Sequence, residues 1–183
     1  MTALFTRLRL LGLAAALVIF AADQALKHYV VEVLGLTEIG DHHDLLPFFD
    51  FTRTNNYGVS LGMFQATSME MRWGLVLVTG LIAVGVLVWI MREVKGWDIA
   101  GLSLILGGAL GNIVDRYNYG YVVDFLDLHF GEFRPFLIFN VADAAITVGV
   151  VILLYRALFI GEKPATEQDE PQADTSRGDQ SNA

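Results

Sequence analysis

Aspartates in apolar surroundings are the residues of this sequence whose type and spacing best suit chemistry. Asp124 lies within YVVDFLDLHF and Asp143 within FNVADAAITVGVV, each beside hydrophobic residues. Two carboxyl groups at hydrogen-bonding distance cannot both ionise, so such a pair shares one proton. One carboxylate then activates a water while the other carboxyl group polarises a scissile carbonyl. The same groups also suit a proton relay in a transporter, and spacing alone leaves both alternatives open.

Asp23 and Lys27 form a second pair of ionisable residues within an apolar stretch. They are four positions apart and share one face if this stretch is helical. An ionisable group at membrane depth costs at least about 2.5–3.5 kcal/mol, so it needs a partner or a function. The two side chains either neutralise each other near the end of a helix or brace a polar site, and Lys27 can also extend towards the interface.

Two asparagines stand at helical spacing from charged residues. Asn112 precedes Asp115 by three positions and Arg116 by four, while Asn140 precedes Asp143 by three. Each group therefore projects from one helix face. Three roles are open for Arg116: binding a phospholipid headgroup, pairing with acids, or anchoring the helix at the membrane interface.

Metal and thiol chemistry have little support in the sequence. The chain has no Cys, which excludes disulfides, iron–sulfur sites and thiol nucleophiles. His42-His43-Asp44 can ligate a metal, but a His pair in a polar loop is usually solvated. Neither an HExxH motif nor a Ser in a nucleophile elbow is present. We therefore expect no metal site and no cofactor.

The candidate residues must be positioned by helices that cross a membrane. Of the 183 residues, 54% are hydrophobic and 17% are charged, and the mean hydropathy is +0.50. The apolar stretches predict an all-α polytopic membrane protein with four transmembrane helices, at about residues 10–31, 73–91, 99–114 and 135–156. In the third stretch, small residues such as Gly108 permit close helix packing. An alternative interpretation of the first stretch is a signal peptide, which leaves three spans.

Basic residues predict the orientation of these helices. The short segments 1–9, 92–98 and 156–163 hold six Lys or Arg, whereas the longer connections 32–72 and 115–134 hold four. By the positive-inside rule, both termini are cytoplasmic and the two long connections lie outside. The net charge of −8 argues against nucleic acid as a partner.

The chain divides into a membrane domain, residues 1–160, and a tail, residues 161–183. The tail holds six acidic and two basic residues and almost nothing apolar, which predicts a disordered, acidic, cytoplasmic segment. In the first outer connection, Leu45–Thr54 is rich in aromatic residues and Thr, a composition that favours a short β-sheet.

Five short motifs together resemble the lipoprotein signal peptidase family, also called signal peptidase II. They follow that family's order over about residues 8–158, and each is weak alone. The motifs are DQALK (Asp23–Lys27), NNYG (Asn55–Gly58), GGALGNIVDR (Gly107–Arg116), VVDF (Val122–Phe125) and FNVAD (Phe139–Asp143).

The resemblance implies an aspartic endopeptidase of the bacterial inner membrane. Such an enzyme removes signal peptides from prolipoproteins by cutting before a Cys that carries diacylglyceryl. By analogy Asp124 and Asp143 are the catalytic pair. The positions that bind substrate or organise the site are Asp23, Lys27, Asn56, Gly58, Gly108, Asn112, Asp115, Arg116 and Asn140. The family architecture adds a small extracytoplasmic β-sheet and an amphipathic surface helix in the long outer connection; we also expect contact with membrane phospholipid and a monomeric state.

One departure from the family pattern lies in an outer loop. After Asn-Xaa-Gly the family commonly has Ala-Ala-Phe, whereas this chain has Val59-Ser60-Leu61, a change that alters loop packing and leaves both acids in place. Two other functional classes stay open. One is a small proton-coupled transporter with Asp23, Lys27 and Asp143 as its relay, and the other is a non-catalytic subunit that assembles through Gly-rich helix faces.

Overall fold

The computed structural model describes residues 6–58 and 68–159, and four helices in these residues are long and apolar enough to cross a membrane. This confirms the predicted membrane fold. The helices are α1 (Arg7–His28), which continues into a π-helical turn (Tyr29–Val33), α2 (Met69–Arg92), α3 (Gly96–Asn118) and α4 (Val141–Phe159).

Two helix boundaries differ from the sequence-based expectation. Helix α3 continues to Asn118, so Asp115 and Arg116 belong to its last turns rather than to the outer connection. Helix α4 begins at Val141 instead of near residue 135, because Phe139 pairs with Leu126 in an antiparallel bridge. An Asn side chain then starts the helix: Asn140 Oδ1 accepts a hydrogen bond from the Asp143 N–H at 2.8 Å, which is how an N-cap satisfies a free helical donor.

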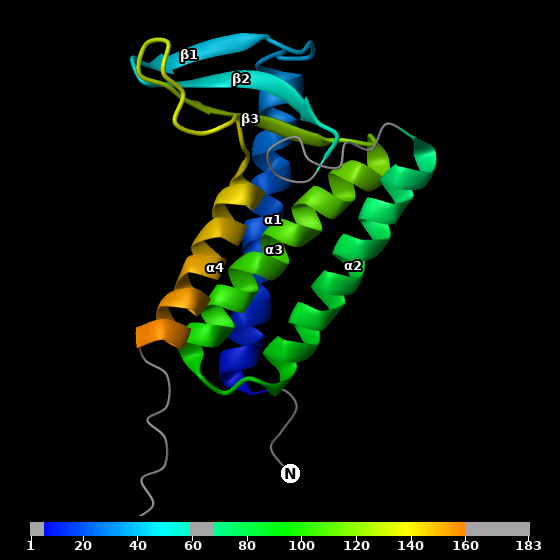
Figure 1. The fold of residues 1–183 in the computed structure, drawn as a ribbon, viewed down its shortest axis with the longest axis vertical. Helices are drawn as coiled ribbons and strands as arrows, with labels where there is room; N and C mark the ends of the chain where they lie inside the picture. Colours follow the sequence, from blue (N-terminus) through cyan, green and yellow to red (C-terminus); the bar gives the residue numbers. More distant parts are fainter. Residues whose placement is uncertain (1–5, 59–67, 160–183) are drawn as a thin grey trace, which may run out of the picture.

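Helix α3 lies in the middle of the bundle and packs against the other three helices (Figure 1). Small residues on α3 make this possible. A side chain on Gly108 would meet the Ala142 carbonyl of α4, and one on Gly107 would meet the Ala16 carbonyl of α1. Close packing therefore explains Gly108, which brings α3 and α4 together just below the aspartates.

A three-stranded antiparallel sheet covers one end of the bundle (Figure 1). Its strands are β1 (His42–Leu46), β2 (Phe49–Asn56) and β3 (Val122–Leu128), in that spatial order. The predicted short sheet is thus confirmed, with a third strand supplied by the second outer connection. Thr54 of β2 pairs with Asp124 of β3, and buried Val123 and Phe125 pack against Val30 beyond the end of α1.

The described ends of the chain, at α1 and α4, lie at the end of the bundle opposite the sheet (Figure 1). Three predictions fall outside the described residues in whole or in part. They are the disordered tail at 161–183, the effect of the departure at 59–61, and the amphipathic surface helix, which has no counterpart in residues 34–58.

Candidate active site

Strand β3 places Asp124 at the junction between the sheet and the helices. Its carboxyl group is 2% exposed, and its Oδ1 accepts a hydrogen bond of 2.6 Å from Asn140 Nδ2. Asn140 is fully buried directly before α4. The residue that caps α4 therefore also orients Asp124.

Asn112 of α3 performs the same task for Asp143. Its Nδ2 donates to Asp143 Oδ1 at 2.8 Å, and its Oδ1 accepts from Asn140 Nδ2 at 3.2 Å. A continuous chain of hydrogen bonds thus runs from Asp124 through Asn140 and Asn112 to Asp143. The structure brings together two acids that are separated in sequence, and neutral amides hold both of them.

Burial and, to a smaller extent, the negative charge of Asp143 raise the pKa of Asp124 from its ordinary value of 3.8, and the net result of all influences is a pKa of about 7. Hydrogen bonds from Asn56 and Asn140 and the charge of Lys27 act in the opposite direction. Asp124 is therefore close to half-protonated at neutral pH. A half-protonated Asp124 is consistent with two neighbouring carboxyl groups that share one proton.

Lys27 is the centre of a neighbouring cluster, which is joined to the chain of amides by a hydrogen bond of 3.4 Å from Lys27 Nζ to Asn112 Oδ1. Its Nζ lies 2.8 Å from Asp23 Oδ2 and 2.8 Å from Asp115 Oδ2, and all three side chains are buried. The amide of Gln24 also donates to Asp23 and Asp115. Charges in such surroundings are stable only when paired and hydrogen-bonded.

This lysine cluster also fixes the backbone on both sides of the site. Asp23 Oδ1 accepts from the N–H of Ala142 at 2.9 Å, and Asp115 Oδ2 accepts from the N–H of Val123 at 3.0 Å. Ala142 precedes Asp143 and Val123 precedes Asp124. Asp23 and Lys27 are therefore an ion pair, as one sequence interpretation expects, and Asp23 also contacts the backbone beside Asp143; that the pair organises the site stays a prediction.

Arg116 connects the site to the outer-loop motif. Its guanidinium group donates to the Gly58 carbonyl, and the Gly58 N–H donates to Asn56 Oδ1 at 3.0 Å. Asn56 in turn hydrogen-bonds Asp124. Arg116 is 7% exposed, a burial that does not fit an interfacial anchor. Every predicted site residue except Gly108, which shapes helix packing, thus has a contact that leads to one of the two aspartates.

Two contributors to this arrangement were not predicted. Gln24 lies inside the DQALK motif, where its hydrogen bonds to two acids were overlooked. Arg72 of α2 donates to the carbonyls of Arg116 and Tyr117 at the end of α3, and its guanidinium packs beside Gly120, whose φ of +87° suits glycine. No local pattern points to Arg72, because its partners follow 44 or more residues later.

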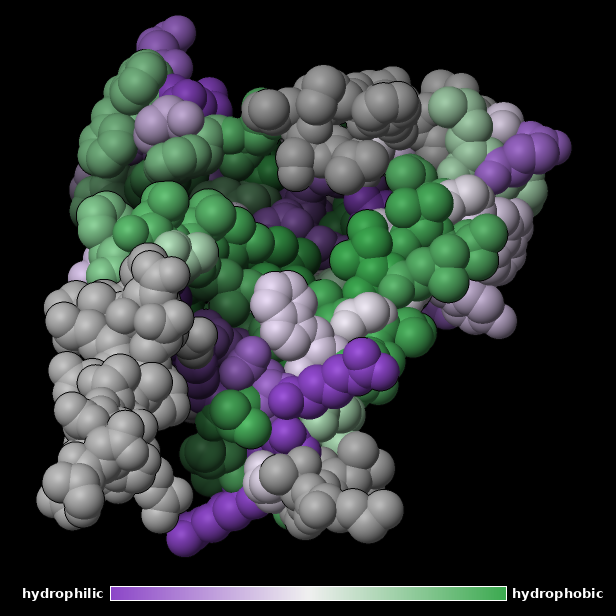
Figure 2. Space-filling model, turned by 60° about the horizontal axis from the view of Figure 1, so that its bottom comes forward, coloured by the Kyte–Doolittle hydropathy of each residue, from purple (hydrophilic) through white to green (hydrophobic). Residues whose placement is uncertain are grey.

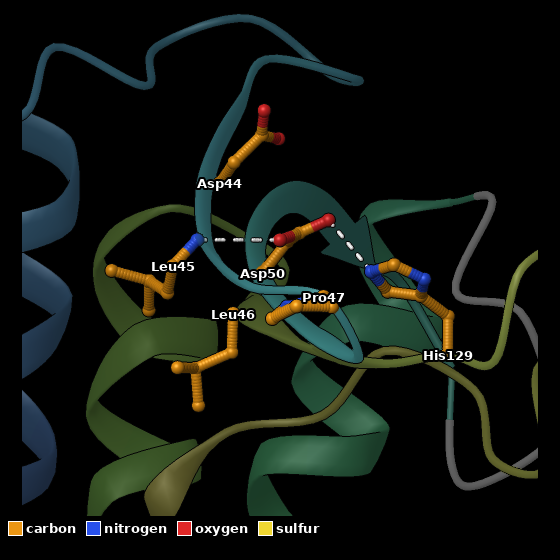
Figure 3. Close-up of a pocket in the computed structure, with 6 residues that line it drawn as sticks. All are labelled: Asp44, Leu45, Leu46, Pro47, Asp50 and His129. Carbon is orange, nitrogen blue, oxygen red and sulfur yellow. Dashed lines mark hydrogen bonds and ion pairs between the residues drawn. The ribbon is translucent and has the colours of Figure 1, made fainter.

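A hollow of about 400 Å³ on the sheet lies apart from these residues (Figure 3). It is lined by the end of β1, the start of β2 and the turn between them, and by His129, whose Nε2 is 2.7 Å from Asp50 Oδ2. The hollow contains none of the predicted site residues. His42 and Asp44 are exposed nearby, and the described residues contain no group of acids and histidines arranged to hold a metal.

Comparison with known proteins identifies the family. A family model described as signal peptidase (SPase) II matches residues 15–159. A protein of Sphingopyxis alaskensis named lipoprotein signal peptidase is 51% identical over 89% of this chain and 94% of its own length. Its namesake in Rhizorhabdus wittichii is 49% identical over 84% and 89% of the two chains.

Solved structures agree with the sequence relatives. A bacterial membrane enzyme structure at 2.3 Å resolution matches with a TM-score of 0.70 and 25% identity, over 88% of this chain and 93% of that one. A second, at 1.9 Å, matches with a TM-score of 0.68 and 27% identity, over 81% and 92% of the two chains. The matched segment contains all five motifs and both aspartates, and the chain belongs to the signal peptidase II family.

Proposed function

We propose that this protein is an aspartic endopeptidase that cuts prolipoproteins before a diacylglyceryl-modified Cys, with Asp124 and Asp143 as its catalytic residues. The observation that carries the proposal is the chain of amides joining these two carboxyl groups, together with a pKa of about 7 at Asp124. Among residues 6–58 and 68–159, neither acid forms an ion pair. Their protonation is thus free to change during a reaction.

The reaction needs one proton on the pair and one water. The ionised carboxylate takes a proton from the water, whose oxygen attacks the scissile carbonyl carbon, while the protonated carboxyl group donates a hydrogen bond to the carbonyl oxygen. The C–N bond then breaks as the leaving amine receives a proton from the pair. Asn112 and Asn140 hold the two carboxyl groups in place throughout, which saves reorganisation at each step.

The membrane setting fits a lipidated substrate. The acyl chains of a diacylglyceryl-Cys remain in the bilayer, while the scissile bond reaches the carboxyl groups where helices meet the sheet. Basic residues gather at the opposite end of the bundle: Arg7, Arg9, Arg92, Lys95 and Arg156. By the positive-inside rule that end is cytoplasmic, so the site faces the outer side of the inner membrane. The proposal includes no metal or cofactor, a monomeric enzyme, and phospholipid around the helices.

The test is a cleavage assay on a purified prolipoprotein, with the diacylglyceryl-modified and unmodified forms side by side. We expect cleavage of the modified form by the native protein and none by Asp124→Asn or Asp143→Asn. Asp44→Asn is the matched control, because the Asp44 side chain is 84% exposed on the sheet. Equal cleavage of both substrates would refute lipid recognition, and a requirement for added zinc after chelation would refute the metal-free mechanism.

A further inference from the structure

A carboxamide joins two acids of the lysine cluster, and no step of the proposed reaction uses it. Gln24 Nε2 donates to Asp23 Oδ2 at 3.2 Å and to Asp115 Oδ1 at 3.0 Å. It also donates to the Gly111 carbonyl oxygen at 3.3 Å. Asp23 belongs to α1, whereas Gly111 and Asp115 belong to α3. The carboxamide therefore holds acceptors on both helices.

The two carboxylates need this neutral donor because one ammonium group faces both of them. Lys27 Nζ contacts Asp23 Oδ2 and Asp115 Oδ2, and the two acids are 0% and 1% exposed. Hydrophilic side chains at the opposite end of the bundle reach the surface instead (Figure 2), where water can solvate them. A buried carboxylate depends on protein donors for the oxygen that its counter-ion does not reach. Gln24 supplies such a bond to Asp115 Oδ1.

The separation of these two carboxylates is transmitted to the reactive acids through the backbone. Asp23 accepts from the N–H of Ala142 and Asp115 from the N–H of Val123, the residues directly before Asp143 and Asp124. An ammonium group attracts both carboxylates but directs neither, because its three donors rotate freely. A planar carboxamide has donors in fixed directions, so it constrains the orientation of the carboxylates as well as their distance.

We propose that Gln24 is a positioning residue, whose carboxamide fixes the Asp23 and Asp115 carboxylates relative to each other. These carboxylates then hold the two backbone N–H groups that precede the catalytic acids. A neutral donor suits this place, because a second cation would compete with Lys27 for the same oxygens. The bridge stands on the contacts alone, whereas its importance for cleavage rests on the proposed function.

Amide hydrogen exchange of the full chain, measured at single residues by NMR, tests the bridge without substrate. Gln24→Met keeps the length of the side chain and removes its donors, so the N–H groups of Val123 and Ala142 should exchange several-fold faster. The N–H of Phe125, also on β3, binds the Phe139 carbonyl at 3.0 Å and should exchange at the native rate. Unchanged exchange at the first two amides, or equal acceleration at Phe125, would overturn the proposal, because the second result is a general loosening.

Kinetics on the diacylglyceryl-modified prolipoprotein test whether the bridge serves cleavage. Gln24→Met should lower kcat about tenfold and leave KM unchanged, since a misplacement of about 1 Å costs up to about 10²-fold. His28→Ala, which removes an exposed polar side chain one turn further along α1, is the matched control and should retain the native kcat. A raised KM with native kcat would contradict the proposal, because Gln24 would then bind substrate.

A swap that conserves charge separates the bridge from a packing effect. Gln24→Glu places a third carboxylate beside Asp23 and Asp115, so kcat should fall further than in Gln24→Met. Adding Asp115→Asn restores the native number of charges, and the introduced amide can donate to the new carboxylate while its oxygen still accepts from Val123. The double variant should therefore recover part of the lost kcat, and activity no higher than that of Gln24→Glu would count against the bridge. Faster exchange at both amides combined with no cleavage by the native protein would contradict the proposed function instead.

Discussion

Two pairs of aspartates lie at the same end of the bundle with different partners, and three of the four acids are buried, whereas Asp143 is partly buried. Asp23 and Asp115 are 0% and 1% exposed, and both contact the ammonium group of Lys27. Asp124 is 2% exposed and, like Asp143, is held by an Asn side chain. Burial alone therefore does not distinguish Asp124 from Asp23 and Asp115.

The partner of each carboxylate sets its role. A buried carboxylate that contacts an ammonium group compensates its charge, and removal of either partner leaves an uncompensated buried charge. A buried carboxylate held by neutral amides has no such constraint and can gain or lose a proton at modest cost. Under the proposed function, the lysine cluster is a fixed scaffold and the Asp124–Asp143 pair is the part that reacts.

The largest expected effect is the loss of cleavage when either acid of the reactive pair is neutralised. Asp124→Asn and Asp143→Asn each remove a proton-transfer group, which is worth about 10²–10⁴-fold in rate. Thermal unfolding of both variants should nevertheless resemble that of the native protein, because neither acid forms an ion pair within the described part of the chain. The assignment of Asp124 and Asp143 as the reactive pair is contradicted if either variant retains native cleavage, or if it loses activity because it does not fold.

Removal of the Lys27 ammonium group should instead lower the stability of the protein first and its activity as a consequence. Lys27→Met leaves Asp23 and Asp115 buried without a counter-charge, which costs about 3–5 kcal/mol of unfolding free energy. The thermal unfolding temperature should fall sharply, and activity should fall with it. The matched control is Lys27→Met combined with Asp23→Asn and Asp115→Asn, in which no charge remains to be buried. This triple variant should recover most of the stability, and a persistent loss would show that packing around Lys27 dominates.

The contrast between the pairs also explains what the sequence could predict. The four spans follow from apolar stretches, and the shared faces of Asp23 with Lys27 and of Asn140 with Asp143 follow from helical spacing. The partner of Lys27 on α3 and the path from Asp124 to Asp143 depend on tertiary packing between segments 16 or more residues apart, which no local pattern specifies. The late start of α4 was missed for a related reason, since Phe139 pairs with a strand in another segment.

The pH dependence of stability separates the pairs without a substrate. Asp124 has a raised pKa of about 7 in the folded protein, against about 4 for an unfolded chain, so the folded state binds this proton more tightly. Unfolding then releases a proton between these values, and stability falls as pH rises from about 4 to about 7. Asp124→Asn should lack this component when the unfolding temperatures of the two proteins are compared across the range. An unchanged slope would contradict the raised pKa.

The smallest expected effect concerns Arg72. It contacts neither pair of aspartates, but it binds the end of α3, which contributes a residue to the surroundings of each pair. Its guanidinium group donates to two carbonyls at the end of α3, the helix that carries Asn112 and Asp115. Arg72→Ala should lower kcat several-fold and unfolding free energy by about 1 kcal/mol, while the pH at which cleavage is half-maximal stays the same. Arg72→Lys should recover part of kcat, because an ammonium group can still bind one carbonyl. A shifted pH profile would mean instead that Arg72 alters the charge environment of Asp124, and the division between scaffold and reactive pair would then not extend to α2.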